Sequence, residues 1–184
     1  MRIGLLLGSF DPIHIGHVNM ATSALNANLV DYVAFVPSMQ NPWKENSTDF
    51  DTRCFMIRLA IADIPHCGIL ETDSLTEAPH YSYNTLKLLK ETNPEHEYYL
   101  IVGMDVATEI KNWYNGEWIL ENFHLITVAR PGYEDSGIVD IPISLDISST
   151  YVRNLFKNKK ITQPLVHSAV ETFIESRNIY KSHE

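Results

Sequence analysis

Short apolar runs that alternate with helix-period segments constrain the fold of this chain more than any other feature of its sequence. The runs lie at residues 3–7, 32–36, 68–70, 98–102 and 125–129. Continuous runs of this length are typical of strands that are buried on both faces of a sheet. Parallel strands need a long crossover between them, and a helix is the usual one. The alternation therefore predicts an α/β fold with a doubly wound, mainly parallel sheet and helices on both faces.

The segments between the runs predict the helices of this Rossmann-like fold. They cover residues 18–29, 51–63, 83–92, 113–122 and a final segment from 164 onwards, with a loop and a short strand over 131–146. Asp51 is the expected cap of the second helix. Pro164 is expected in the first turn of the last helix, which should close an edge of the sheet. The 184 residues are the length of one domain, expected to span 1–184.

The charge balance excludes two classes of partner. The chain has 23 acidic residues against 14 lysines and arginines, a net charge of −9 at pH 7. Nucleic acids and acidic membranes bind basic surfaces, so neither is an expected partner.

The cysteines, Cys54 and Cys67, lack metal-ligand spacing and indicate thiols in a reducing compartment. Residues 1–7 are too short for a signal peptide and no apolar run is as long as a membrane span, so we expect a cytoplasmic protein.

Residues 8–17, which we call the phosphate turn, follow the first buried strand and lead into the first helix. A glycine at such a turn lets backbone N–H groups approach an anion, and the helix N-terminus adds partial positive charge. His14 and His17 are three residues apart and share one face of the first helical turn. Either histidine alone would more simply be a cap or a surface residue. The whole decapeptide after a buried strand favours a phosphate site.

Residues 147–153 offer a second set of phosphate-binding groups. Three hydroxyls stand at the start of a helix, with Arg153 about one turn further along. Hydroxyls, exposed N–H groups and a guanidinium all bind phosphate oxygens. From the hydroxyls alone, a simple helix cap is an equally good interpretation.

These two segments together resemble a known family. His14-Ile15-Gly16-His17 resembles the (T/H)xGH signature of the nucleotidyltransferase superfamily, and residues 147–153 resemble the ISSTxxR signature of its adenylyltransferases. Further matches are similar to the bacterial nicotinate mononucleotide adenylyltransferases. They are residues 53–60, residues 80–86, and Gly103-Met104-Asp105 followed by Trp113-Tyr114. The resemblance covers nearly the whole chain.

The resemblance implies transfer of the adenylyl group of ATP to nicotinate mononucleotide, with release of pyrophosphate. It implies a catalytic set that acts on the phosphates, namely His17, His14, Lys44 and Arg153. It implies ATP contacts by Gly8, Ser9, Phe10, Asp11, Gly16, Gly103, Asp105, Ile147, Ser148, Ser149 and Thr150. It implies acceptor contacts by Thr85, Trp113 and Tyr114, with Trp113 stacked on the pyridine ring and backbone groups around Thr85 and Tyr114 binding the nicotinate carboxylate. Mg²⁺ is expected to come with ATP, held mainly by substrate phosphates and by no dedicated metal site.

Two alternatives stay open at this stage. Phosphopantetheine adenylyltransferases share both phosphate signatures but lack the Trp-Tyr segment. A non-catalytic nucleotide-binding regulator on the same fold is the other alternative, and its support is Trp43, which replaces the histidine of the family's P-P-H-(K/R) loop next to Lys44. The sequence leaves homo-oligomerisation open.

Overall fold

A six-stranded parallel sheet organises the computed structural model, which describes residues 1–39, 48–128, 140–141 and 147–181. Its strands lie in the order β3-β2-β1-β4-β5-β6. All the neighbouring pairs are parallel, which confirms the expected doubly wound sheet. The strands are β1 (Arg2–Gly8), β2 (Tyr32–Pro37), β3 (Cys67–Ile69), β4 (Glu97–Gly103), β5 (His124–Val128) and β6 (Asp140–Ile141).

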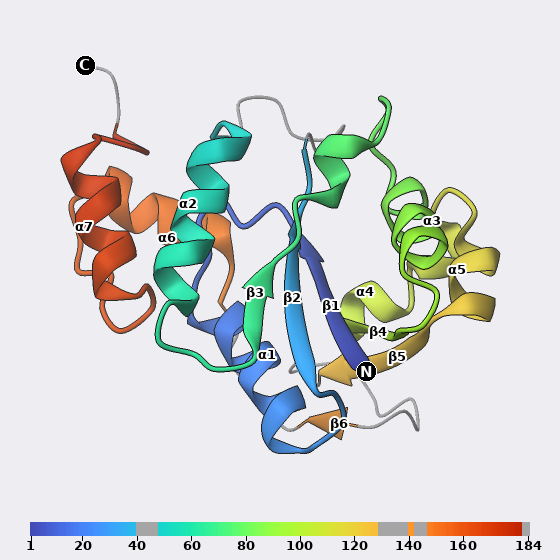
Figure 1. Cartoon of the computed structure of the whole chain (residues 1–184). Helices are drawn as coiled ribbons and strands as arrows, with labels where there is room; N and C mark the ends of the chain where they lie inside the picture. The colour runs from blue at the N-terminus through green and yellow to red at the C-terminus, as the bar shows by residue number, and fades with distance from the viewer. Residues whose placement is uncertain (40–47, 129–139, 142–146, 182–184) are drawn as a thin grey trace.

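Helices cover both faces of this sheet, as Figure 1 shows. One core contains residues of α1, α2, α6 and α7, and the other contains residues of α3 and α5. Along β1, Leu5 packs in one core and Leu6 in the other, as the alternation of a strand requires. The helices are α1 (Ile15–Asn26), α2 (Phe50–Ile61), α3 (Ser82–Thr92), α4 (Met104–Ala107), α5 (Gly116–Asn122), α6 (Ser149–Lys157) and α7 (Ser168–Ser176), with 3-10 turns η1 (Thr72–Leu75) and η2 (Ile110–Asn112). Within the described ranges, no helix is long and apolar enough to cross a membrane.

The strand order fixes where a ligand can bind. From β1 the chain winds outward through β2 and β3, and it then returns to the other side of β1 through β4. In open parallel sheets, ligands bind at the carboxyl ends of the strands where the winding reverses. The phosphate turn leaves β1 at this point, and Gly103 ends the neighbouring β4.

Two helix starts differ from the expected ones. The first helix begins at Ile15 rather than near Val18, because His14 occupies the cap position. The expected helix over 113–122 begins later, as α5 at Gly116. Asn115 has a left-handed φ of 52°, and a Cβ on Gly116 would lie 1.9 Å from the carbonyl oxygen of Ile110. Only glycine fits that approach, so α5 starts at Gly116.

The expected role of Pro164 is wrong. The helix α7 starts at Ser168, after the cap residue His167. The segment before it stays non-helical because the carbonyl of Leu165 accepts the N–H of Ile15 at 2.8 Å, which attaches it to the start of α1. The helix packs against α2, where the Phe55 and Phe173 rings lie 4.7 Å apart, and does not close a sheet edge (Figure 1).

The cap of α2 is Asp49 and not the expected Asp51. Its Oδ1 accepts the N–H of Thr52 at 2.9 Å. Hydrogen bonds from Thr52 are the main cause that holds the pKa of Asp49 below its ordinary value. The ionised carboxylate is therefore the form that stabilises the helix start.

We expect Asp49→Ala to lower the free energy of unfolding by about 1 kcal/mol at pH 7, the usual contribution of such a cap. A carboxyl whose folded-state pKa is lowered contributes stability above its unfolded pKa, and this stability is lost as the pH falls through the folded pKa. Urea denaturation of both proteins at several pH values measures the difference. A gap that stayed constant from pH 7 into the acid range below the folded pKa would contradict the assignment.

Candidate active site

The phosphate turn is anchored by a buried aromatic ring. Phe10 has a left-handed φ of 50° and its side chain is 1% exposed. The ring lies 5.6 Å from that of Phe35 and 4.9 Å from that of His17, centroid to centroid. A Cβ on Gly8 would lie 3.1 Å from this ring, so glycine makes the close approach possible. Because the side chain of Phe10 is in the core, only the backbone of residue 10 is available to a ligand at the turn.

The two histidines lie together at the start of α1, as expected. Their rings stack with centroids 3.7 Å apart. The backbone N–H of His14 donates to Nδ1 of His17 at 3.3 Å. Because Nδ1 of His17 is an acceptor, the proton of the neutral ring lies on Nε2. The neutral His17 ring thus has an N–H donor on its Nε2 edge, and the helix N-terminus adds positive potential beside it.

Residues 147–153 are bonded directly to the phosphate turn. The hydroxyl of Ser149 donates to the carbonyl of Pro12 at 3.0 Å, and Arg153 Nη1 donates to the carbonyl of Asp11 at 2.7 Å. A Cβ on Gly16 would lie 2.8 Å from Cγ2 of Ile147, so the start of α1 also touches this segment. The two sequence signatures form one site.

Within this segment, each polar group has a distinct contact. Ser148 is the cap of α6, and its hydroxyl accepts the N–H of Tyr151 at 3.2 Å. Arg153 Nη2 donates to the hydroxyl of Thr150 at 3.0 Å. A guanidinium has five N–H groups, and the bonds to Asp11 and Thr150 use two of them. The half-buried Arg153 can therefore hold the turn and still donate to a phosphate.

Asp11 has a buried carboxylate that two distant segments reach. Its Oδ1 accepts the hydroxyl of Tyr180, and its Oδ2 accepts the N–H of Thr48 at 3.2 Å. Burial, followed by the charge of Asp11, raises the pKa of Tyr180 well above its ordinary value, so this hydroxyl stays a donor. Tyr180 is not among the site residues that the sequence predicts, and no local pattern marks it.

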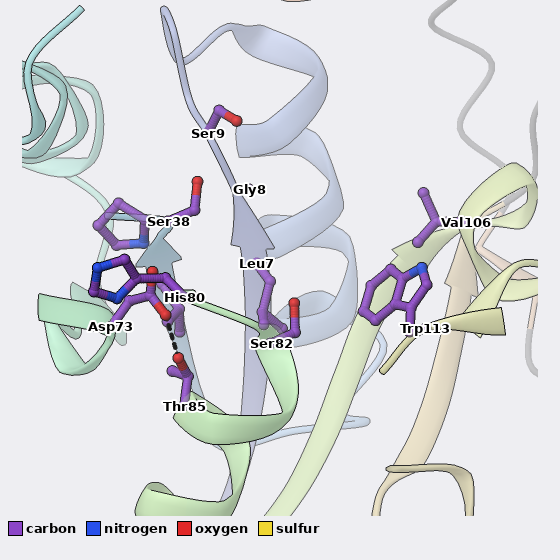
Figure 2. Close-up of a pocket in the computed structure, with 12 residues that line it drawn as sticks. Leu7, Gly8, Ser9, Ser38, Asp73, His80, Ser82, Thr85, Val106 and Trp113 are labelled. Atoms are coloured by element: carbon purple, nitrogen blue, oxygen red, sulfur yellow. Dashed lines mark hydrogen bonds between the residues drawn. The ribbon is translucent and has the colours of Figure 1, made fainter. Parts of the chain in front are cut away.

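A cavity of about 310 Å³ opens beside the phosphate turn. Figure 2 shows Trp113 and Val106 on one side of it, with His80 and Asp73 on the other. Gly8 and Ser9 belong both to this wall and to the phosphate turn, so a molecule in the cavity would meet one bound at the turn. The lining residues are Leu7, Gly8, Ser9, Val36, Pro37, Ser38, Asp73, His80, Ser82, Thr85, Val106 and Trp113.

Two of the three expected acceptor residues line this cavity. Trp113 and Thr85 do, and Thr85 is 1% exposed, with its hydroxyl donating to Oδ1 of Asp73. Tyr114 is not part of the lining. Its side chain is 53% exposed and its ring stacks on that of Tyr81, 4.7 Å away. Tyr114 can therefore contribute to an acceptor site only through its backbone groups.

The remaining expected residues divide into two groups. Gly103 and Asp105 lie at the carboxyl end of β4, where Gly103 is the cap of α4 and Asp105 is in its first turn. Lys44 and Trp43 lie outside the described residues.

Arg53 is a site residue that sequence reasoning missed. It is 1% exposed, the largest of the fully buried side chains. Its guanidinium donates to three carbonyls, those of Thr48 at 2.8 Å, Ser9 at 2.7 Å and Met39 at 3.1 Å. It thus connects the phosphate turn with the ends of the segment that contains Lys44. Residues 53–60 resemble the family, but the resemblance gave Arg53 no role, and the same spacing in α2 also fits an exposed arginine.

A doubly wound sheet that places a glycine turn, two stacked histidines and two helix starts at its switch point is the arrangement of a nucleotidyltransferase. The cytidylyltransferase-like family model matches residues 5–155. A probable nicotinate-nucleotide adenylyltransferase of Cytophaga hutchinsonii is 36% identical, over 100% of both chains. The nicotinate-nucleotide adenylyltransferase of Bacillus subtilis is 32% identical, over 98% of this chain and 99% of its own. The chain belongs to the nicotinate-nucleotide adenylyltransferases of the cytidylyltransferase-like family.

The comparison of folds agrees with this. A solved structure described as Plasmodium falciparum nicotinic acid mononucleotide adenylyltransferase complexed with NaAD superposes with a TM-score of 0.82. It is 24% identical, and the match covers 97% of each chain. This likeness confirms the Rossmann-like architecture.

Proposed function

We propose that this chain transfers the adenylyl group of ATP to nicotinate mononucleotide, giving deamido-NAD and pyrophosphate, a step of NAD biosynthesis. Its family membership supports the reaction. The structural observation that carries the assignment is the shared wall, in which Gly8 and Ser9 belong both to the phosphate turn and to the cavity with Trp113 and Thr85. Two phosphate-bearing substrates bound on either side of this wall would have their phosphates adjacent.

The chemistry needs no enzyme nucleophile. A phosphate oxygen of the mononucleotide attacks the α-phosphorus of ATP, a new P–O bond forms, and the bond to the bridging oxygen breaks as pyrophosphate leaves. The protein then acts by alignment and by stabilising the charge that develops on the phosphates.

We assign the alignment and the charge stabilisation to four residues. His17 donates from Nε2 to the α-phosphate, and His14 holds the ring of His17 by stacking and by its backbone N–H. Arg153 and Lys44 bind the β- and γ-phosphates. The contacts of Arg153 with Asp11 and Thr150 support its part, because they fix the guanidinium over the phosphate turn.

Backbone groups do most of the binding of ATP in this proposal. The helices α1 and α6 both start at the phosphate turn, and N–H groups at helix starts are suited to phosphate. We assign residues 103 and 105, at the end of β4, to the adenosine. The ATP-binding set is Gly8, Ser9, Phe10, Asp11, Gly16, Gly103, Asp105, Ile147, Ser148, Ser149 and Thr150.

A divalent cation, which we take to be Mg²⁺, accompanies ATP as part of the substrate. Among the described residues, no group of three or more His, Cys, Asp or Glu side chains is placed to hold a metal ion. Phosphate oxygens and water are the ligands that Mg²⁺ prefers at nucleotide sites. When bound, the cation would neutralise part of the phosphate charge.

The acceptor is assigned to the cavity. Trp113 offers a ring face on which the pyridine can stack, and stacking of this kind contributes about 1–3 kcal/mol per base. Ser82 begins α3 and lines the same cavity, so the first N–H groups of that helix are suited to a carboxylate. Backbone groups near Thr85 and Tyr114 complete the carboxylate site.

An acceptor panel tests this function. With ATP and Mg²⁺, we expect pyrophosphate release with nicotinate mononucleotide to exceed that with nicotinamide mononucleotide by about tenfold or more, since a hydrogen bond to a charged group contributes about 1.5–3 kcal/mol. Equal rates with both would refute the carboxylate site. Release with phosphopantetheine alone would replace the proposed reaction, and ATP binding without release from any acceptor would favour the non-catalytic regulator.

The setting of the reaction is also a proposal. Cys54 and Cys67 are free thiols, and burial raises the pKa of each to about 11, which keeps them protonated and unreactive. Free thiols are the usual state in a reducing compartment, which supports a cytoplasmic location. One sheet with a core on each face supports a single domain over 1–184.

A further inference from the structure

Asp73 is a buried carboxylate in the wall of the acceptor cavity, and both of its oxygens are used inside the protein. It lies on η1 and is 4% exposed. Oδ1 accepts the hydroxyl of Thr85, a contact that Figure 2 shows, and Oδ2 accepts the backbone N–H of Met39 at 2.6 Å. A buried carboxylate is tolerated when such bonds compensate its lost hydration. Asp73 is thus placed to hold parts of the protein rather than to bind substrate.

Met39 is held from two sides. Its N–H donates to Asp73 and its carbonyl accepts from Arg53 Nη2 at 3.1 Å. The same guanidinium donates to the carbonyl of Ser9 at 2.7 Å. A continuous chain of hydrogen bonds therefore runs from Thr85, through Asp73, Met39 and Arg53, to Ser9.

The two ends of this hydrogen-bond chain lie at the proposed sites of different substrates. Thr85 is in the wall of the acceptor cavity, and Ser9 is in the phosphate turn. Asp73 links the acceptor cavity to the phosphate turn. Among the described residues, it alone bonds both to Thr85 and to Met39, which Arg53 holds from the other side. Both terminal bonds of the chain are charge-assisted, the stronger kind of hydrogen bond.

We propose that Asp73 is a positioning residue for the transfer, which fixes the acceptor cavity relative to the phosphate turn by holding Thr85 and Met39 together. This inference rests on the proposed function. Loss of Asp73 should weaken the binding of both ATP and the acceptor, although Asp73 itself is not expected to contact ATP. It should also lower turnover, because small errors in the alignment of two reacting groups lower the rate steeply.

The test compares Asp73→Ala, Asp73→Asn and Thr85→Val. For Asp73→Ala we expect ATP to bind about tenfold more weakly, the acceptor KM to rise about tenfold and kcat to fall, as for the loss of charge-assisted bonds. The amide oxygen of asparagine can still accept the N–H of Met39, whereas its NH2 group can only donate, in the reverse direction, to the hydroxyl of Thr85. Both links are then neutral, so we expect about threefold effects on both substrates in parallel. Thr85→Val breaks the link to the acceptor cavity but leaves Met39 anchored, so it should raise the acceptor KM and lower kcat while ATP affinity stays unchanged. Glu77 is an exposed acidic residue close to Asp73 in the sequence, so Glu77→Ala is the matched control. It should change neither the affinity for ATP nor the kinetic constants for the acceptor.

ATP affinity is measured by calorimetry without acceptor, and the kinetic constants by pyrophosphate release. The proposal is overturned if both Asp73 variants bind ATP within about twofold of the unmodified protein, or if Thr85→Val weakens ATP as much as Asp73→Ala does. If Asp73→Ala does not fold, Asp73→Asn alone tests the proposal, through the expected parallel change in ATP affinity and acceptor KM. An unmodified protein that releases no pyrophosphate would refute the proposed function, while the calorimetry would still test whether Asp73 supports the phosphate turn.

Discussion

Replacement of His17 by alanine is expected to lower turnover by about 10²–10³-fold, the scale on which enzymes lose rate when one transition-state donor is removed. In the structure, His17 Nδ1 accepts the N–H of His14, which leaves the proton of the neutral ring on Nε2. No other His17 edge is an N–H donor in that form. Because the donor acts on charge that develops during transfer, the loss should appear in kcat more than in the KM for ATP.

Steady-state pyrophosphate release measures this effect. His124→Ala is the matched control, since His124 lies at the start of β5 and its side chain is 69% exposed. We expect the control to keep full turnover. A loss below about threefold in His17→Ala, with an unchanged thermal midpoint, would remove His17 from the mechanism.

Replacement of Arg53 by methionine is expected to lower the free energy of unfolding by about 3 kcal/mol, because three partly buried carbonyls lose their donor and each costs about 1 kcal/mol, the low end of the range for unsatisfied buried groups. Methionine keeps much of the side-chain volume, so a cavity contributes little. The carbonyls concerned belong to Thr48, Ser9 and Met39, so ATP affinity should fall as well.

Arg58→Met is the matched control on the same helix. Arg58 pairs with Glu71, and both side chains are well exposed, at 49% and 39%. An exposed pair of this kind contributes about 0–1 kcal/mol. Urea denaturation of the two variants separates the cases. Equal destabilisation by both substitutions would contradict the structural role of Arg53.

Local patterns predicted the scaffold of this protein well. The apolar runs are recognisable because a strand buried on both faces is apolar along its buried length, as residues 3–6 of β1 and 33–37 of β2 are. The phosphate turn and residues 147–153 were also predictable, since each motif is contiguous. Their contact follows from neither motif alone, and it needed the fold to bring Ser149 to Pro12.

The residues that were missed act through distant partners. Arg53 and Asp73 contact backbone groups of other loops, and nothing in their own segments indicates which loops those are. The start of α7 was misplaced because the bond between Leu165 and Ile15 overrides the preference of Pro164 for a first helical turn.

The bonds that hold the phosphate turn have a consequence for the order of folding during synthesis. Asp11 and Pro12 leave the ribosome early, whereas their partners Ser149, Arg153 and Tyr180 follow 137, 142 and 169 residues later. At the usual rate of translation this separation lasts roughly ten seconds. The nascent chain therefore carries its phosphate-binding sequence long before it can hold that sequence in shape, and nucleotide binding should begin only as the segment containing α6 and α7 docks.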